Sequence, residues 1–438
     1  MKLPGYVTDC LDALENAGYE VYAVGGCVRD AVLGREPQDY DLCTEALPEQ
    51  IQSVFQNHKL VLAGTKHGTV GVITDGGVVE ITTFRTEGGY TDARHPDWVK
   101  FVPRVEEDLA RRDFTVNAMA YSPKRGFRDP FGGREDLKNK VLRAVGDPET
   151  RFREDALRIL RGARFASRYG LRAEPETARA MFSLAPLMDK LARERVFEEL
   201  CKLLETATAA DLLAFAPVVT AAVPELAPQV GFDQRTPHHA YDIFTHTAHV
   251  VGNVPADMTL RWAALLHDVG KPASFTVDPD GRGHFKGHAG VGAELADAVL
   301  RRLKAPTALR EDVVLLIGQH MTRMEPDKKF LRRRLSRLGP EMMEKLMLLQ
   351  YADMCSKGVS KDEEQAQFRQ VRVLLEQVLE EDACLTVRDL AVDGNDLMAL
   401  GFRGKEIGDR LNALLEQVLD ERLPNEKNSL LKSAEKMR

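Results

Sequence analysis

The chain has 438 residues and a formal net charge of −7, with 44% hydrophobic and 29% charged residues. This length allows two to four domains that each bury a core, and the composition is typical of soluble globular proteins. No apolar run approaches the roughly 18 residues of a membrane span and no secretory signal opens the chain, so no membrane partner is expected. Six cysteines are scattered without CxxC pairs, which excludes a zinc ribbon or disulfide framework and favours a cytoplasmic protein.

Positive charge is concentrated in one stretch of this acidic chain. Residues 100–172 hold 18 lysines and arginines against 11 acidic residues, so the remainder is more acidic than the total suggests. Because phosphate groups are bound by lysine and arginine, a polyanion such as a nucleic acid is expected to contact this stretch.

The first 150 residues alternate helix and strand patterns. Apolar residues at helical spacing predict a helix that ends at Gly18, and a second helix over 28–34 follows a glycine-rich turn. β-Branched runs predict strands over 19–26, 39–44, 68–74 and 78–84, and the Gly/Thr/Asp-rich segment 85–97 is predicted to be a mobile loop. After Pro148 almost the whole chain has helical spacing. The predicted fold class is α+β, with a mixed-sheet head followed by an all-helical neck, body and tail.

The glycine-rich turn predicts an anion site. Gly25 and Gly26 precede a helix, where backbone N–H groups and the helix dipole favour a bound anion, and Arg29 adds a cation one turn later. This arrangement suits a phosphate group.

Carboxylates follow at the spacing of a metal site. Asp39 and Asp41 alternate in a predicted strand, which puts both side chains on one face, and Glu80 in the next strand pair could supply a third carboxylate. Mg²⁺ prefers oxygen ligands and commonly bridges protein carboxylates to substrate phosphates. In a two-metal scheme the ions activate an attacking hydroxyl and stabilise the leaving pyrophosphate, so no histidine base is required.

At these residues the chain resembles the class II nucleotidyltransferases, the family of bacterial CCA-adding enzymes and bacterial poly(A) polymerases. The resemblance covers at least residues 20–205 and includes GGCVRDAVLGREPQDYDL, TTFRTEGGYTDARHP, EDLARRDFTVNAMAY, DPFGGREDL and RAVGDPETRFREDALRILRGARFASRYG. It implies that Asp39 and Asp41 are the metal carboxylates. It also implies that Gly26, Arg29 and Arg112 hold the triphosphate or sugar, and that Asp113 and Asn117 shape the ribose site.

The segment EDALRILRGARFA is expected to select the base of the incoming nucleotide. On a helix, Asp155 and Arg158 share a face, and Arg161 and Arg164 continue it at the same spacing. An acceptor beside a forked donor can bind the Watson–Crick edge of a base. The resemblance implies that Asp155 and Arg158 pair with either CTP or ATP, while Arg161 and Arg164 line the nucleotide site. A solvated, salt-bridged helix face is the alternative.

The helical body resembles the HD superfamily of metal-dependent phosphohydrolases in HHAYDIFTHTAHVV, WAALLHDVGKP, HFKGHAGVGAE, LLIGQH and LLQYADM. The resemblance implies that His246, His267, Asp268 and Asp353 hold one ion, with His288 and His320 placed for a second. Imidazole and carboxylate ligands suit a divalent transition metal or Mg²⁺, and metal-bound water could attack a phosphoester. The domain could be a hydrolase, or an RNA-binding or structural module.

The resemblance implies four domains, which are a catalytic head (1–145), a neck with the nucleotide-selecting helix (146–205), an HD-type body (206–360) and a tRNA-binding tail (361–438). The expected function is addition of C, C and A to the tRNA 3′ end from CTP and ATP with Mg²⁺, and the loop at 85–97 favours complete CCA synthesis. The basic stretch 328–337 and the tail from Asp393 are expected to contact tRNA. Alternatives are a CC-adding enzyme, a poly(A) polymerase, an HD phosphohydrolase with an RNA-binding head, and a non-catalytic tRNA-binding protein.

Overall fold

The computed structural model describes residues 1–88, 98–360, 362–381 and 384–437. The chain divides into two compact units, Met1–Ala227 with Arg302–Lys304, and Pro228–Arg301 with Ala305–Arg438. Among the described residues, no helix combines the length and apolar character of a membrane span. The described part of the loop predicted over 85–97 is strand β6, and residues 89–97 lie outside the description.

A seven-stranded mixed sheet forms the head, in the order β3-β4-β5-β2-β1-β8-β9. Only the pairing of β2 with β5 is parallel within this sheet, and the other neighbours run antiparallel. The mixed sheet predicted for the head is therefore confirmed. The strands are β1 (Val21–Val24), β2 (Asp41–Thr44), β3 (Leu60–Val61), β4 (Thr69–Thr74), β5 (Gly77–Thr83), β8 (Ala120–Ser122) and β9 (Gly126–Arg128).

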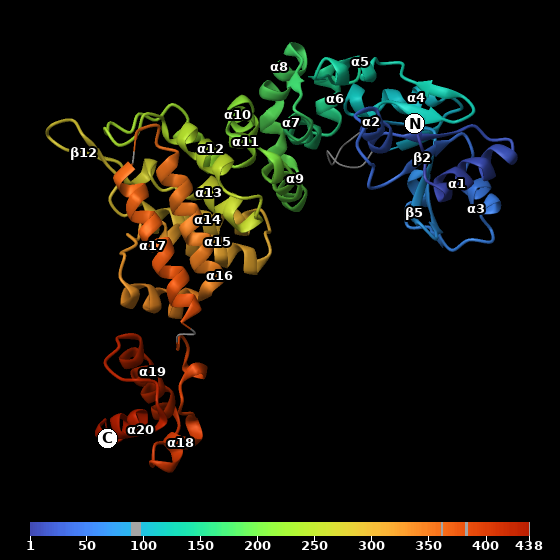
Figure 1. Ribbon diagram of the computed structural model, residues 1–438. Helices are drawn as coiled ribbons and strands as arrows, with labels where there is room; N and C mark the ends of the chain where they lie inside the picture. Colours follow the sequence, from blue (N-terminus) through green and yellow to red (C-terminus); the bar gives the residue numbers. More distant parts are fainter. Residues whose placement is uncertain (89–97, 361, 382–383, 438) are drawn as a thin grey trace. The chain divides into compact units, whose positions relative to one another are not determined.

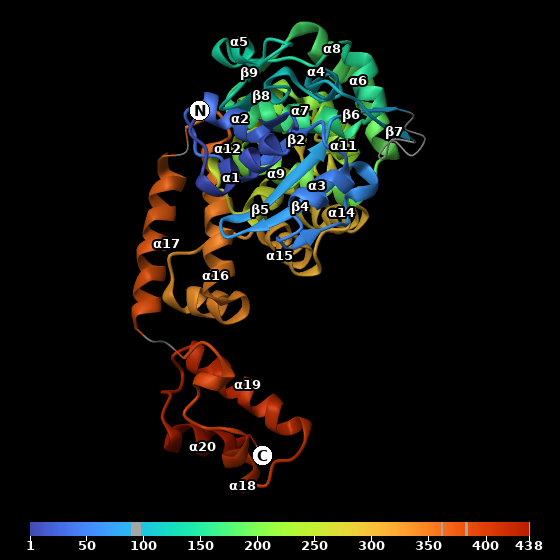
Figure 2. The ribbon, with the colours of Figure 1, turned by 90° about the vertical axis from the view of Figure 1, so that its right-hand side faces the viewer.

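Helices α1 (Gly5–Asn16) and α3 (Pro48–Val54) pack beside this sheet, as Figures 1 and 2 show. Helix α1 buries Val7, Leu11 and Leu14, which recur at helical spacing and form one apolar stripe. Helix α2 (Gly26–Val32) follows β1 directly, so the chain turns from strand to helix at Gly25. Further elements of the head are β6 (Arg85–Gly88), β7 (Trp98–Phe101), α4 (Val105–Ala110), the 3₁₀ turn η2 (Thr115–Asn117) and α5 (Gly133–Lys138).

Helices complete the first unit. Helix α7 (Leu157–Tyr169) packs along α9 (Arg193–Thr206), and the short strands β10 (Val141–Leu142) and β11 (Arg172–Ala173) pair in parallel beside them. The other helices are α6 (Pro148–Glu154), α8 (Pro175–Leu184), α10 (Ala209–Ala214) and α11 (Ala216–Ala222).

The structure corrects the prediction of one helix through residues 154–166. Helix α6 ends at Glu154, α7 begins at Leu157, and Asp155 between them has extended backbone angles. The carboxylate of Asp155 accepts a hydrogen bond from the backbone N–H of Leu157 at 3.0 Å. Aspartate commonly makes such local bonds at helix starts, and this explains why the helix is interrupted here.

The second unit is helical apart from a short hairpin of β12 (Thr276–Val277) and β13 (Gly283–His284). Its central helices are α12 (Ile243–Asn253), α13 (Met258–Leu266), α14 (His288–Arg302), α15 (Thr307–Gln319), α16 (Lys328–Cys355) and α17 (Asp362–Glu380). The tail helices α18 (Gly394–Ala399), α19 (Lys405–Leu419) and α20 (Lys427–Lys436) surround a core of their own that includes Leu397, Leu414 and Leu430. The helical character predicted after Pro148 is confirmed, with β11 and the hairpin as short exceptions.

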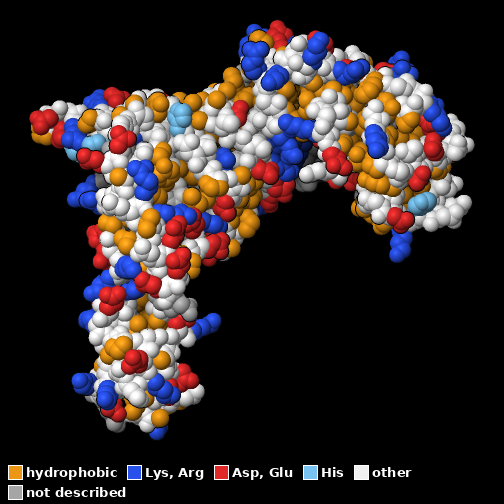
Figure 3. Space-filling model, in the orientation of Figure 1, with side chains coloured by type: hydrophobic (Ala, Val, Ile, Leu, Met, Phe, Trp, Pro, Cys, Tyr) orange, Lys and Arg blue, Asp and Glu red, His pale blue; other side chains and the backbone are white. Residues whose placement is uncertain are grey.

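The basic stretch at the start of α16 is partly neutralised within its unit, through Lys328, Arg332 and Arg333. Arg332 pairs with Glu381 and Glu421, Lys328 also pairs with Glu381, and Arg333 lies 2.5 Å from a carboxylate oxygen of Asp420. Figure 3 shows basic and acidic side chains next to one another over α16 and α17. Contact of this stretch with tRNA stays a prediction, and these ion pairs would compete with it.

Gly133→Ala is predicted to destabilise the head. A Cβ atom at Gly133 would overlap the carbonyl group of Thr115, whereas one at Gly5 would meet no atom within 4 Å. Both glycines are the first residue of a helix, so Gly5→Ala is the matched control. We expect Gly133→Ala to lower the free energy of unfolding by about 1–3 kcal/mol in urea titrations. An equal stability of the two variants would contradict the packing described here.

Candidate active site and metal centre

The turn between β1 and α2 brings backbone and guanidinium groups together. Gly25 has φ +75°, and its N–H donates to the carbonyl of Met119 at 3.1 Å. A Cβ atom at this position would lie 2.8 Å from Nη1 of Arg112. Only glycine permits both the backbone angle and the close approach, so the turn places Arg112 against the start of α2.

The predicted metal carboxylates meet beside this turn. Asp41 is the first residue of β2 and is in register with Glu80 on β5, whereas Asp39 precedes the strand instead of lying within it as predicted. Partial withdrawal from water raises the pKa of Asp41, the carboxylates of Glu80 and Asp39 raise it further, and Arg112 opposes them. A divalent cation would relieve this repulsion, so the donor set fits Mg²⁺.

One cavity of about 570 Å³ unites the candidate residues of the head. Every nucleotide-binding residue predicted from the sequence lines it, together with two of the three predicted catalytic carboxylates. The predicted lining residues are Gly25, Gly26, Arg29, Asp39, Asp41, Arg112, Asp113, Asn117, Asp155, Arg158, Arg161 and Arg164. Arg111, Phe165 and Arg195 also line the cavity and were not predicted.

A buried hydrogen-bond network connects the head to α7 across this cavity. Nε and Nη2 of Arg161 donate to Oδ2 of Asp113 at 2.9 and 2.7 Å, and Asn117 donates to Oδ1 at 3.0 Å. The side-chain oxygen Oδ1 of Asn117 in turn accepts from Nη1 of Arg29 at 2.5 Å. Burial opposes ionisation of Asp113, but Arg161 and the Asn117 hydrogen bond outweigh it and hold its pKa well below the usual range. Asp113 is therefore a fixed negative charge.

Asp155 and Arg158 line the cavity but do not form an ion pair with each other. Arg195 donates to Oδ2 of Asp155 at 3.2 Å. Arg158 donates to Glu154 at 2.7 Å and to the carbonyl of Arg111 at 3.1 Å. These partners hold both side chains in place, and each side chain keeps further donor or acceptor capacity for a ligand. Arg195 is 40 residues from its partner, and no local pattern in the sequence could have linked them.

Glu199 is a further residue that the sequence analysis missed. It is 5% exposed on α9 and accepts from Nε of Arg164 at 2.7 Å. Its position on the apolar face of α9, beside Val196 and Leu203, was a usable signal, because a carboxylate on a buried face needs a cationic partner.

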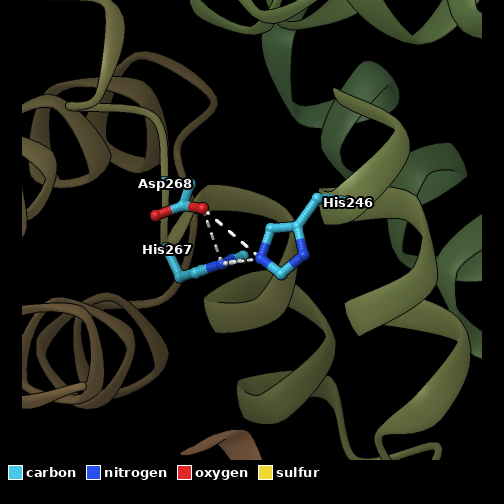
Figure 4. A group of neighbouring side chains, drawn as sticks. All are labelled: His246, His267 and Asp268. Carbon is cyan, nitrogen blue, oxygen red and sulfur yellow. Dashed lines mark hydrogen bonds and ion pairs between the residues drawn. The ribbon is translucent and has the colours of Figure 1, made fainter. Parts of the chain in front are cut away.

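A second constellation lies in the helical body, where buried imidazoles surround Asp268. Nε2 of His246 and Nε2 of His267 are 3.3 Å apart, and Oδ2 of Asp268 lies 3.5 and 3.1 Å from them. Figure 4 shows the ring nitrogens and this carboxylate oxygen pointing toward one centre. Asp353 on α16 adds a carboxylate oxygen 3.0 Å from His246.

His288 and His320 occupy the other side of the Asp268 carboxylate. Their Nε2 atoms are 3.3 Å apart and lie 3.4 and 4.0 Å from Oδ1 of Asp268. Burial lowers the pKa of His320 to about 4, so this imidazole is neutral at pH 7. The structure thus forms two groups that could each hold a metal ion, with Asp268 common to both.

Backbone carbonyls orient all four imidazoles. The Nδ1 atoms lie 3.1 Å from Ser356 O for His246, 2.8 Å from Ala264 O for His267, 2.7 Å from Phe285 O for His288 and 2.6 Å from Ile317 O for His320. A carbonyl partner requires a proton on Nδ1, which leaves the lone pair of each neutral imidazole on Nε2. Such outer hydrogen bonds are typical of histidine metal ligands.

Two buried lysines accompany this centre and were not assigned a role from the sequence. Nζ of Lys271 lies 2.8 Å from Oδ2 of Asp268 and donates to Gln234 at 2.9 Å, and Nζ of Lys357 lies 3.3 Å from Asp353. Both lysines line a cavity of about 350 Å³ above Asp268. The cavity therefore combines metal-ligating groups with cations that suit a phosphate group.

Profiles of known domains match the regions that contain these two groups of residues. The profile of the poly A polymerase head domain matches residues 21–143, that of a probable RNA and SrmB-binding site of polymerase A matches 170–229, and that of the HD domain matches 243–358. A CCA-adding enzyme of Levilactobacillus brevis is 34% identical over 96% of this chain and 95% of its own length. The chain belongs to the CCA-adding enzyme family.

Other members of the CCA-adding enzyme family match a shorter part of the chain at higher identity. A CCA-adding enzyme of Leuconostoc mesenteroides is 49% identical, over 47% of this chain and 51% of its own length. The crystal structure of the Bacillus stearothermophilus CCA-adding enzyme in complex with CTP is similar over 100% of this chain and 98% of that one, with 29% identity and a TM-score of 0.73. The family resemblance seen in the sequence is confirmed, and the chain is a nucleotidyltransferase.

Divalent-ion binding in the helical body is predicted to follow the two groups. We expect chelator-treated protein whose head site is removed by Asp39→Ala and Asp41→Ala to bind two Mn²⁺ ions in calorimetry, because Asp268 offers one oxygen to each group of the body. The variants below are made in this background. His246→Ala should lose one ion, His288→Ala the other, and Asp268→Ala both.

The control for this titration is His284→Ala, since His284 is exposed and pairs with Asp278 outside both groups. It should bind as the wild type does. Unchanged stoichiometry in all three ligand variants would show that the cluster is not a metal site.

Proposed function

We propose that this protein adds C, C and A in turn to the 3′ end of tRNA, using CTP and ATP and no nucleic-acid template. A single cavity that combines paired carboxylates, a phosphate-binding turn and an Asp/Arg base-facing pair carries this proposal. The similarity to CCA-adding enzymes over nearly the whole chain supports it, and the RNA-binding profile at 170–229 supports an RNA partner.

Asp39 and Asp41 would hold Mg²⁺, with Glu80 beside them, and the metal would activate the 3′-hydroxyl and stabilise the leaving pyrophosphate. The backbone N–H groups at Gly26 and the guanidinium of Arg112 are placed to bind the triphosphate. The chain needs no histidine base in this cavity.

Base choice would follow from the donor and acceptor pattern of the pocket. Cytosine and adenine both present an exocyclic amine next to a ring nitrogen acceptor, whereas uracil and guanine present a carbonyl next to a ring N–H. Asp155 can accept from the amine and Arg158 can donate to the ring nitrogen. Asp113 and Asn117, bonded to each other and to Arg161, would shape the ribose site.

The body supports a second candidate function, a metal-dependent phosphohydrolase site. The observation that favours it is the buried carboxylate of Asp268, which two pairs of imidazoles share. This carboxylate lines a cavity together with Lys271 and Lys357. Transition metals such as Mn, Fe, Ni or Co suit these ligands, and a metal-bound water would be the nucleophile. We place both activities in the cytoplasm, where all six cysteines, none of which forms a disulfide in the described structure, would stay reduced.

Asp39→Ala and Asp41→Ala are each predicted to lower nucleotide addition to a few per cent or less while tRNA binding is retained. The carboxylates act on the chemical step, whereas RNA affinity comes mainly from cations elsewhere. The assay uses tRNA transcripts that end before the first C, after CC and after CCA, with each NTP alone or together.

Asp12→Ala is the matched control, because this carboxylate on α1 is exposed and lies outside the cavity. It should add nucleotides at the wild-type rate. In the same assay a wild-type protein that stops after CC would be a CC-adding enzyme, and one that extends a tail of A would be a poly(A) polymerase.

Asp155→Ala and Arg158→Ala are predicted to change base choice more than total rate. Losing one hydrogen bond of the pocket should reduce discrimination against U and G, or between C and A, roughly ten- to a hundredfold. Incorporation of all four NTPs, measured one at a time on each transcript, gives this selectivity. Arg153→Ala, an exposed arginine paired with Glu149 on α6, is the control. Wild-type base choice with a uniformly lower rate in both pocket variants would show that the pair is structural.

A further inference from the structure

A cavity of about 240 Å³ lies on the head, apart from the nucleotide site. It forms where α1, the chain that follows α3 and the turn between β4 and β5 meet, and α1 and α3 lie side by side there (Figure 1). Among the described residues, it shares none with the nucleotide cavity or with the cavity of the body. Neither of the proposed functions therefore uses this cavity.

Aromatic side chains form walls of this cavity. Phe55 is buried, and its ring makes an edge contact with the imidazole of His58 at 5.5 Å between centroids. Tyr6 makes a similar edge contact with Tyr40 at 6.2 Å. Gly76 of the β4–β5 turn lies against the same ring, because a Cβ atom at Gly76 would overlap Cδ1 of Tyr6. The Tyr6 ring is therefore held from two sides, and this wall is in place before a ligand binds.

Two carboxylates give the cavity a negative charge. Asp9 on α1 and Asp75 in the β4–β5 turn both line it and are exposed. In the described parts of the chain, neither carboxylate forms an ion pair or accepts a hydrogen bond. No lysine or arginine of the described residues lines the cavity. Both charges therefore remain available to a cationic ligand.

A buried polar group also lines the cavity. Cys10 is 3% exposed, and its thiol has no hydrogen-bond partner among the described residues. Burial and then the charge of Asp9 raise the pKa of this thiol to about 11, so the thiol is neutral at pH 7. A neutral thiol is a weak acceptor that a ligand N–H group can use. The effect of Asp9 also shows that its charge reaches the interior of the cavity.

This combination suits a small cation with an aliphatic body. An aromatic ring attracts an ammonium group, and carboxylates pair with it. A phosphate or carboxylate ligand would instead be repelled by Asp9 and Asp75. The cavity is smaller than the roughly 300–1,000 Å³ typical of sites for drug-sized ligands, so it suits a ligand of only a few heavy atoms.

We propose that this cavity binds a small aliphatic diamine of the polyamine class. One ammonium group pairs with Asp9 and the other with Asp75, while the ring of Tyr6 and the side chain of Ile73 contact the chain between them. Carboxylates on two separate elements favour a ligand with two ammonium groups over a lysine side chain, which has one. No residue of the nucleotide cavity takes part, so the proposal does not rest on the proposed function.

The test is an NMR titration of the full-length protein labelled at the δ1-methyl groups of isoleucine. Putrescine should shift the signal of Ile73, assigned with Ile73→Val, in a saturable way with one ligand per protein. Butylamine has the same length and a single ammonium group, as a lysine side chain does, and should bind about two- to fivefold more weakly. The uncharged 1,4-butanediol should leave the signal unshifted.

Variants of the cavity test which groups bind the ligand. Asp9→Asn and Asp75→Asn should each raise the Kd for putrescine about two- to fivefold, because each removes one ion pair. Tyr6→Leu should have an effect of the same size, whereas Tyr6→Phe should retain the wild-type Kd because its ring is kept.

Asp12→Asn is the matched control, since Asp12 lies on the same helix outside the cavity. It should leave the Kd for putrescine unchanged. An Ile73 signal that does not shift, or that shifts without saturating, would overturn the proposal. Equal Kd values for Asp9→Asn, Asp75→Asn and the control would overturn it too, because they would indicate general attraction of a cation to an acidic chain. Butylamine that binds as tightly as putrescine would overturn the diamine as the ligand and indicate a lysine side chain of a partner protein.

Discussion

The ion pair between Asp113 and Arg161 is the interaction on which the nucleotide site depends. Asp113 is 7% exposed, and a carboxylate so far from water costs several kcal/mol unless a cation and hydrogen bonds compensate it. Arg161 and Asn117 supply both, and Asn117 is in turn held by Arg29 on α2. Because Arg161 belongs to α7, satisfying this one charge sets α7 against the head. It places Asp155 and Arg158, the proposed base-selecting pair, in one cavity with Asp39 and Asp41.

The helical body also contains a buried carboxylate whose charge must be compensated, but other groups compensate it. Asp268 is 2% exposed, and it is surrounded by four imidazoles and the ammonium of Lys271. Each imidazole is turned by a backbone carbonyl so that Nε2 faces the centre. In the head a buried carboxylate is matched by a guanidinium and becomes a fixed structural charge. In the body a buried carboxylate is matched by groups that also suit a metal ion.

Helix α7 contributes several side chains to the nucleotide cavity. Arg158, Arg161, Arg164 and Phe165, all on this helix, line the nucleotide cavity. A protein that selects bases without a template must hold its own hydrogen-bonding groups as rigidly as a paired strand would. Arg158 donates to Glu154 and to the carbonyl of Arg111, and Asp155 accepts from Arg195. These hydrogen bonds would give the proposed base-selecting pair this rigidity.

Local pattern in the sequence indicated the fold class, the helical body, the glycine turn and the paired carboxylates Asp39 and Asp41, because glycine turns, alternating carboxylates and helical spacing are properties of neighbouring residues. The family resemblance supplied the other predicted residues of the two sites. Reasoning from local pattern placed Asp155 on a helix and Asp39 in a strand, and the structure corrects both. The tertiary structure alone decided which residues neutralise one another. Arg195 holds Asp155 and Glu199 holds Arg164, and these partners are 40 and 35 residues apart. They are chosen by the need of each buried charge for the nearest opposite charge in space, which no local spacing records.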